Sequence, residues 1–384
     1  MRRLYLDHNA TTPLVSPALD RFNRVAGEVW GNASSVHHFG QQAKAVLDGA
    51  RASVAALLGA EPSEVVFTGG GTDGDNAALR GAAEALEPAG RRHLIVSSIE
   101  HEAVLQTAKA LGKRGWRVTV LPVDGSGVVS PTALADALTD DTAVVSVMHA
   151  NNEIGTLQPI ADLAALAKAR GALFHTDAVQ TAGKIPVDVR TLGVDLLSIS
   201  AHKFGGPKGT GALWIRRGVR LVPFMTGGRQ ERGRRAGTEN VPAIAGMGAA
   251  ADYARETMAA TAPRVAALRD RLERGILERV PGTAVNGSGP RVPNTTNISV
   301  DRVESESLLI ALDLEGVAVS SGSACSSGTL EPSHVLKAMG FPHHRTLNSL
   351  RFSLGGSNTE EEIDHVVSVL PALVTKLRGL AARA

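Results

Sequence analysis

One lysine near the middle of the chain has the setting of a nucleophile. Lys203 lies in the run SAHKFGGPKG, residues 200–209, where an apolar strand gives way to a turn rich in Gly and Pro. A lysine at the mouth of a sheet is partly removed from water, which lowers the pKa of its amine and lets it form a Schiff base. Most lysines are solvated surface residues, but none of the other lysines in this chain has such a setting. We therefore expect Lys203 to carry pyridoxal 5'-phosphate (PLP).

A second stretch can hold the phosphate of such a cofactor. Residues 69–74 read GGGTDG, follow an expected strand and open an expected helix. The amides of this loop and the hydroxyl of Thr72 suit a phosphate at a helix N-terminus. The same letters fit the GxGxxG pattern of dinucleotide-binding proteins, but the acidic residue that this pattern needs, about 20 positions later, is displaced to Glu100. Both interpretations place a phosphorylated cofactor here. A third interpretation is a plain turn without a ligand.

Three polar side chains near expected strand ends suit the ring of PLP. The Asp177 carboxylate can pair with a protonated pyridine nitrogen, although a lone Asp after a strand is more often a helix cap. Gln180 lies three residues later and can bind the phenolic oxygen. His101 can stack on the ring and move protons, and a purely structural role is its alternative.

Cys325, the only cysteine, lies among Ser and Gly in SSGSACSSGT, residues 320–329. A free cysteine is usually a small buried hydrophobe, but these neighbours offer no core, so we expect a nucleophilic thiolate on a polar loop. Arg351 can bind a substrate carboxylate through two hydrogen bonds, and Asn152 can assist. A single cysteine excludes an intramolecular disulfide and fits a reducing compartment, so we expect a cytoplasmic protein.

The composition excludes several classes of function. The 384 residues are 43% apolar and 20% charged with a net charge of +2, which indicates no strong attraction to nucleic acid or to a membrane surface. No apolar run approaches the ~20 residues that span a bilayer. The histidine pairs lack metal-site spacing, so we expect no metal. The basic run RQERGRRAGTEN, residues 229–240, is interpreted as a set of solvated surface charges. The alternative is an RNA contact, which the lack of aromatic residues between the basic ones disfavours.

The order of the expected elements explains how these residues meet. Short apolar strands alternate with helices, which predicts a largely parallel sheet covered on both faces. A mostly helical stretch, 241–280, follows, with Pro263 as a kink or break. Beyond the turn-rich residues 281–294, further strands and helices predict a smaller α+β domain. We expect residues 14–258 to form the large cofactor domain, and residues 1–13 with 259–384 to form the small domain that carries Cys325.

Taken together, these segments resemble the cysteine desulfurases, PLP enzymes of the class V aminotransferase family and fold-type I. The similarity extends from YLDHNATTP near the N-terminus to LRFSLGG near the C-terminus. Its most specific motifs are SAHKFGGPKG, HTDAVQTAGK, MHANNEIG, GGRQERGRRAGTEN and SSGSAC. The resemblance implies a large domain with a mostly parallel seven-stranded sheet, a smaller α+β domain and a homodimer.

The resemblance also implies a role for each candidate residue. Lys203 would hold PLP, with Asp177 at the ring nitrogen, Gln180 at the phenolate oxygen and His101 on the ring. The residues that would contact the phosphate are Gly71, Thr72, Ser200, His202 and, from the other subunit of the homodimer, Thr238. Asn152 would face cofactor and substrate, Arg351 the substrate, and Cys325 would receive sulfur.

The expected reaction converts L-cysteine to L-alanine and leaves a persulfide on Cys325. An acceptor protein, such as a scaffold for iron–sulfur clusters or a component of tRNA thiolation, would then collect the sulfur. A selenocysteine lyase or another class V aminotransferase is the alternative enzyme. The alternative from another class is a sulfur-relay or RNA-binding partner without catalysis, which would need neither Lys203 nor Asp177.

Overall fold

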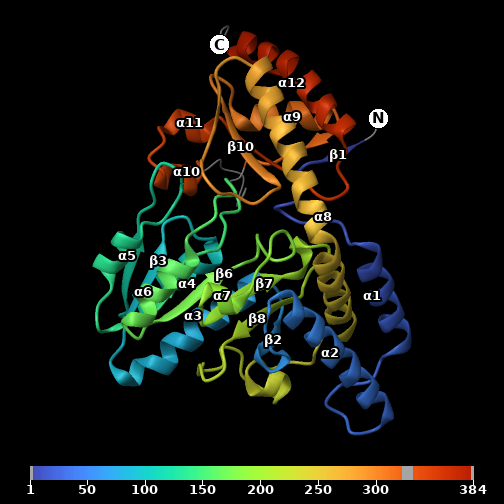
Figure 1. Ribbon diagram of the computed structural model, residues 1–384, viewed down its shortest axis with the longest axis vertical. Helices are drawn as coiled ribbons and strands as arrows, with labels where there is room; N and C mark the ends of the chain where they lie inside the picture. The colour runs from blue at the N-terminus through green and yellow to red at the C-terminus, as the bar shows by residue number, and fades with distance from the viewer. Residues whose placement is uncertain (1–2, 322–331, 382–384) are drawn as a thin grey trace.

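The computed structural model describes residues 3–321 and 332–381. Its centre is a seven-stranded sheet in which only β8 runs antiparallel to its neighbours (Figure 1). In spatial order the strands are β2 (Val65–Thr68), β8 (Gly211–Ile215), β7 (Leu196–Ser200), β6 (Leu173–Asp177), β5 (Thr142–Ser146), β3 (His93–Ser97) and β4 (Arg117–Leu121). The expected mostly parallel, seven-stranded sheet is confirmed.

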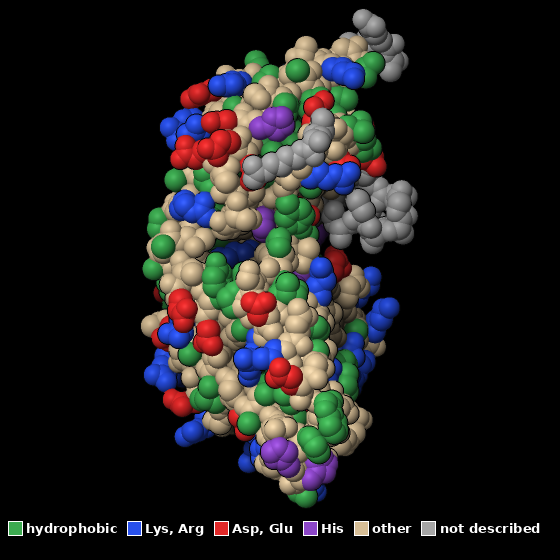
Figure 2. Space-filling view, turned by 90° about the vertical axis from the view of Figure 1, so that its right-hand side faces the viewer, with side chains coloured by type: hydrophobic (Ala, Val, Ile, Leu, Met, Phe, Trp, Pro, Cys, Tyr) green, Lys and Arg blue, Asp and Glu red, His purple; other side chains and the backbone are tan. Residues whose placement is uncertain are grey.

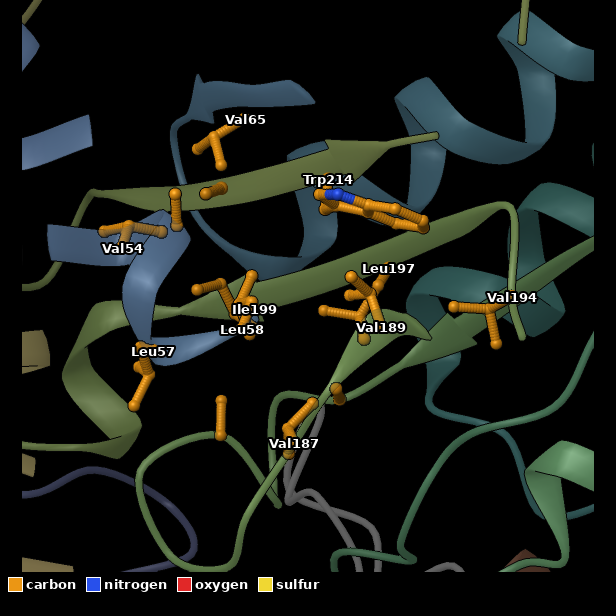
Figure 3. Close-up of a cluster of buried hydrophobic side chains, with 14 of the residues drawn as sticks. Val54, Leu57, Leu58, Val65, Val187, Val189, Val194, Leu197, Ile199 and Trp214 are labelled. Carbon is orange, nitrogen blue, oxygen red and sulfur yellow. The ribbon is translucent and has the colours of Figure 1, made fainter. Parts of the chain in front are cut away.

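Helices cover both faces of this sheet because its strands are apolar on both sides. One face packs against α3 (Gly71–Leu86) and α4 (Glu102–Lys113) through residues such as Leu79 and Leu111. The other face packs against α2 (His38–Leu57), α6 (Ile160–Ala169) and the short α7 (Val189–Leu192). Figure 3 shows part of this second core, which includes Leu197 and Ile199 of β7, Trp214 of β8 and Val54 of α2. The remaining elements of this region are α1 (Ser16–Glu28), α5 (Pro131–Ala137), η1 (Pro62–Glu64), η2 (Glu87–Ala89), η3 (Ala201–Lys203) and η4 (Gln230–Gly233).

A smaller α+β unit has a core of its own. β10 (Thr295–Val300) pairs antiparallel with β9 (Thr283–Val285) and β12 (Ser349–Ser353), and β1 (Leu4–Tyr5) pairs parallel with β11 (Val317–Ala318). In the described chain, α9 (Ser305–Leu314) and α12 (Glu360–Ala381) contribute to this core and α11 (His343–Leu347) packs against β10. α10 (His334–Ala338) packs through Val335 and Leu336 against Ile99 and Met148 of the larger unit. Leu4 and Leu6 belong to this core although they begin the chain. The proposed domain limits at residues 13 and 258 stay a prediction.

One helix joins the two parts. α8 (Val241–Arg279) packs against α1 and α2 at one end and against α12 at the other (Figure 1). Of the two outcomes expected at Pro263, a kink or a break, the break is wrong, because α8 continues through this residue, and the kink stays a prediction. Proline leaves the carbonyl four residues earlier without its helical partner, but Ala259 and Pro263 are both exposed, so water can satisfy it. Among the described residues, no helix combines the length and the apolarity that crossing a membrane requires.

Candidate active site

The expected site residues meet in one cavity of about 480 Å³. The cavity lies where the carboxyl ends of β6 and β7 meet the N-terminal segment and β12 of the smaller unit. Figure 2 shows the surface hollowed between the upper and lower parts of the molecule, with blue Lys or Arg side chains at the base of the hollow. The expected residues that line the cavity of about 480 Å³ are Gly71, Thr72, His101, Asn152, Asp177, Gln180, Ser200, His202, Lys203 and Arg351.

The sheet explains why residues so distant in sequence come together. Asp177 is the last residue of β6 and Ser200 is the last residue of β7. Parallel strands present their carboxyl ends at one edge of a sheet, which is where ligands bind in open α/β folds. η3 begins directly after Ser200 and turns Lys203 back over this edge. The cavity is thus a product of strand order rather than of any single loop.

Lys203 has the properties of a reactive amine. Its Nζ donates to the backbone carbonyls of Asn9 at 2.5 Å and Ala10 at 2.9 Å. Burial, and then the positive charge of Arg351, lower the pKa of Lys203 to about 8, while Asp177 and Asp7 oppose this change. Roughly a tenth of a lysine with such a pKa is neutral at pH 7, against less than a thousandth for a solvated one.

Buried carboxyl groups surround the same edge of the sheet. The Asp177 Oδ1 accepts a hydrogen bond from the Val179 amide at 2.8 Å, and burial raises the pKa of this carboxyl, against the charges of His101 and Lys203. Burial also raises the pKa of Asp75 and of Glu100, in Glu100 to about 8, and the negative charge of Asp177 adds to both effects. A cationic ring nitrogen bound beside Asp177 would favour the charged form of this carboxyl and pair with it. Sequence reasoning missed Asp75 here, because a polar residue inside a helix gives no sign of where it points.

The opposite end of the cavity suits a phosphate. It continues into a space of about 380 Å³ bordered by Gly71, Thr72, Ser200, His202 and Lys208. The Ser200 hydroxyl is buried and has no hydrogen-bond partner within the described chain. A Cβ on Gly71 would lie 2.8 Å from Val179 Cγ2, so the absence of a side chain lets α3 begin close to Val179. An unpartnered hydroxyl and a bare helix N-terminus are what a phosphate group requires, and the residues fit PLP at both ends.

Burial also keeps His202 uncharged at this end. It lowers the pKa of His202 to about 4, with further contributions from Lys203 and Lys208, and the Nδ1 lies 3.1 Å from the Thr11 hydroxyl. A neutral imidazole can donate a hydrogen bond to a phosphate without carrying the countercharge. The cation that borders this space is Lys208.

Two residues that sequence reasoning missed organise the wall behind Lys203. The Gln180 amide donates from Nε2 to the Asn9 carbonyl at 3.0 Å, and its Oε1 accepts from Lys184 at 2.8 Å. The Lys184 amine also donates to Asn9 Oδ1 at 3.0 Å. Asn9 belongs to the motif YLDHNATTP and Lys184 to the motif HTDAVQTAGK, and only the tertiary structure brings the two residues together.

Arg351 and His101 lie on the wall with partners of their own. The Arg351 guanidinium donates to Asp7 Oδ1 at 2.6 Å and to the Asn152 carbonyl at 3.1 Å, and its buried Nε has no acceptor in the described chain. An incoming carboxylate would compete with Asp7 for this guanidinium. His101 borders the cavity, and its Nδ1 also caps α4 by accepting from the Ala103 amide at 3.1 Å. Both of the roles considered for His101 are thus compatible with its position.

Thr238 is the one expected site residue of the described chain that does not line the cavity. Thr238 is exposed on the loop that follows η4, and Cys325 lies outside the described residues. The loop is not a simple solvated charge run, because Glu231 is buried and accepts from Arg51 at 2.6 and 2.7 Å and from the Phe67 amide at 2.9 Å. Arg235 adds an ion pair of 3.1 Å with Asp73. Thr238 is therefore presented on an anchored loop at the surface.

Comparisons with known proteins identify the family. Residues 4–366 match the aminotransferase class-V family. A cysteine desulfurase IscS from Dictyoglomus turgidum is 48% identical over 99% of this chain and 96% of its own, and a cysteine desulfurase from Sinorhizobium fredii is 49% identical over 98% of both. Among solved structures, a NifS-like protein has a TM-score of 0.92 and 38% identity, covering 98% of this chain and 100% of its own. DndA from Streptomyces lividans has a TM-score of 0.77 and 39% identity, covering 90% and 97%. The chain therefore belongs to the class-V aminotransferase family and, within it, to the cysteine desulfurases.

Proposed function

We propose that this enzyme uses PLP to convert L-cysteine to L-alanine and that Cys325 receives the sulfur. The observation that carries the proposal is a single cavity that combines a lysine with a pKa of about 8, a buried carboxylate and a bare phosphate cradle. PLP, when bound, supplies an electron sink for charge that develops on the α-carbon of an amino acid. Lys203, Asp177 and Gln180 would hold its ring.

The remaining residues of the cavity bind the substrate and move its protons. Gly71, Thr72, Ser200 and His202 would hold the phosphate. Arg351 would exchange its contact with Asp7 for the carboxylate of the amino acid, which fixes the α-carbon near Lys203. The neutral amine of Lys203 can then take the α-proton, because its pKa of about 8 lies near physiological pH.

The sulfur step balances without any outside oxidant. The Cys325 thiolate attacks the sulfur of the substrate, a sulfur–sulfur bond forms and the carbon–sulfur bond breaks. The electron pair of that bond stays with carbon, which gains a proton and leaves as alanine. Carbon is thereby reduced and the transferred sulfur oxidised to the persulfide level, and a thiol of an acceptor can remove it afterwards.

Finer features of the function are part of the same proposal. Relatives named IscS and NifS-like support a protein acceptor for the sulfur, such as an iron–sulfur scaffold. Exposure of Thr238 on an anchored loop supports a homodimer in which this residue reaches the phosphate in the partner's cavity. The single cysteine of the chain supports a reducing, cytoplasmic location.

The test is to supply L-cysteine to the PLP-loaded protein and to quantify alanine with and without a reducing thiol. We expect continuous turnover with the thiol and about one alanine per subunit without it, because the persulfide blocks the acceptor sulfur. Cys325→Ala should abolish alanine formation but keep bound PLP, whereas Lys203→Ala should lose both. Ser323→Ala, a change in the same run, serves as the control. Undiminished alanine from Cys325→Ala would refute the role of the thiol, and turnover of selenocysteine alone would favour a selenocysteine lyase.

A further inference from the structure

A second lysine, half-buried, stands behind the cavity and has no part in the reaction proposed above. Lys184 is held by two side-chain oxygens, Gln180 Oε1 at 2.8 Å and Asn9 Oδ1 at 3.0 Å. Burial lowers its pKa well below the ordinary value, and the charges of Lys203 and Arg351 add to this effect. An amine withdrawn from water is costly unless its donors are satisfied, and these two oxygens satisfy it.

Backbone carbonyls determine which way the two amides face. The Asn9 carbonyl can only accept, so the group of Gln180 that lies 3.0 Å from it is the nitrogen Nε2. The Asn152 carbonyl likewise requires the nitrogen of the Asn9 side chain at 3.0 Å. Both amide oxygens then face Lys184, which donates to each of them, and Asn9 Oδ1 also accepts from Asn294 Nδ2 at 3.0 Å.

We propose that Lys184 is a positioning residue that keeps the nitrogen of Gln180 turned toward the cofactor. The Nε2 carries two hydrogens, and the Asn9 carbonyl takes one of them. The second hydrogen is left for an acceptor in the cavity, whose wall includes Gln180. The inference rests on the proposed function, in which that acceptor is the ring oxygen of PLP.

Removing the amine should release this arrangement. Lys184→Met keeps an unbranched side chain but offers no donor. Gln180 Oε1 then loses its partner, whereas Asn9 Oδ1 still accepts from Asn294 Nδ2 at 3.0 Å. The Gln180 amide is held only through the Asn9 carbonyl, so its orientation is less well fixed. One unsatisfied buried acceptor of ordinary strength corresponds to roughly a tenfold change in an equilibrium constant. We therefore expect PLP to bind about tenfold more weakly, and the absorbance maximum of the bound cofactor to move.

A double-mutant cycle separates positioning from a general effect of charge or packing. PLP dissociation constants are measured by titrating the apoprotein, for wild type, Lys184→Met, Gln180→Met and the double variant. If Lys184 acts through Gln180, its replacement weakens binding in the wild-type background but changes little once Gln180 is gone. Lys376→Met, which removes an exposed lysine of α12, is the matched control and should leave both affinity and absorbance unchanged.

The outcomes distinguish this inference from the function on which it rests. Equal affinity of wild type and Lys184→Met, or a loss of the same size in both backgrounds, would overturn the inference alone. A wild-type protein that binds no PLP would overturn the proposed function and the inference with it. Thermal unfolding of each apoprotein reports folding. Should Lys184→Met not fold, Lys184→Gln keeps one donor, and the cycle with Gln180→Met is repeated with it, with a smaller loss expected.

Discussion

At the scale of single residues, the chemistry of the site depends on opposing charges around one amine. Burial and Arg351 lower the pKa of Lys203 to about 8, and Asp177 raises it. Only the neutral amine reacts with an aldehyde, so the rate at which the apoprotein takes up PLP should rise about tenfold per pH unit below pH 8 and level off above it. Arg351→Met should move this profile to higher pH, and Asp177→Asn should move it to lower pH.

The measurement is the loading rate between pH 6 and pH 10, followed by absorbance. Pyridoxal without its phosphate is a useful second probe, because it reports the lysine without the phosphate cradle. Arg271→Met removes an exposed arginine of α8 and should leave the profile unchanged. An unchanged profile in both Arg351→Met and Asp177→Asn would show that burial alone sets the pKa of Lys203.

Residue patterns predict the site well where local sequence decides the position of a side chain. Asp177 and Ser200 end apolar strands, and a parallel sheet must gather such ends at one edge. Asn9 and Lys184 escaped prediction because their hydrogen bonds join segments about 170 residues apart, for which no local pattern exists. Pro263 does not end α8, although a strong local rule favours a break there, because solvent exposure lets water satisfy the freed carbonyl.

At the scale of elements, the phosphate cradle depends on the short distance between the first residue of α3 and the turn that follows β6. A Cβ on Gly71 would lie 2.8 Å from Val179 Cγ2, within the range that real contacts exclude. Gly71→Ala should therefore crowd the cradle at a cost of about 1–3 kcal/mol and weaken PLP binding by tenfold or more. Titration of the apoprotein with PLP measures the loss.

The same contact supplies a rescue. Val179→Ala removes the methyl group that the new Cβ would strike, so the Gly71→Ala/Val179→Ala protein should recover most of the lost affinity. The single variant Val179→Ala controls for the cavity that the smaller side chain leaves. Failure of the double variant to recover would mean that the amide geometry at the start of α3, rather than crowding, determines phosphate binding.

At the scale of the whole molecule, α8 sets how the two cores are placed around the cavity. Its first half packs against α2, and its second half contributes Leu272 and Ile276 to the core of the smaller unit, which also carries β12 and Arg351. The packing against α2 is close at one point. A Cβ on Gly248 would lie 2.7 Å from the Cα of Ala50, a backbone atom that cannot turn aside.

Gly248→Ala should consequently push the two helices apart and destabilise the protein by about 1–3 kcal/mol, less the gain of up to about 1 kcal/mol from better helix propensity. Gly49→Ala is the matched control in α2, since a Cβ there meets nothing within 4 Å, and it should stabilise the protein by about 0.5–1 kcal/mol. Urea unfolding midpoints compare the two. If Gly248→Ala lowers the free energy of unfolding and Gly49→Ala raises it, the limiting contact lies between α2 and α8. Because α8 also carries the smaller unit, Gly248→Ala should in addition weaken substrate binding at Arg351. Stabilisation by both changes would mean that the helices have room to adjust, and that the placement of Arg351 does not depend on this crossing.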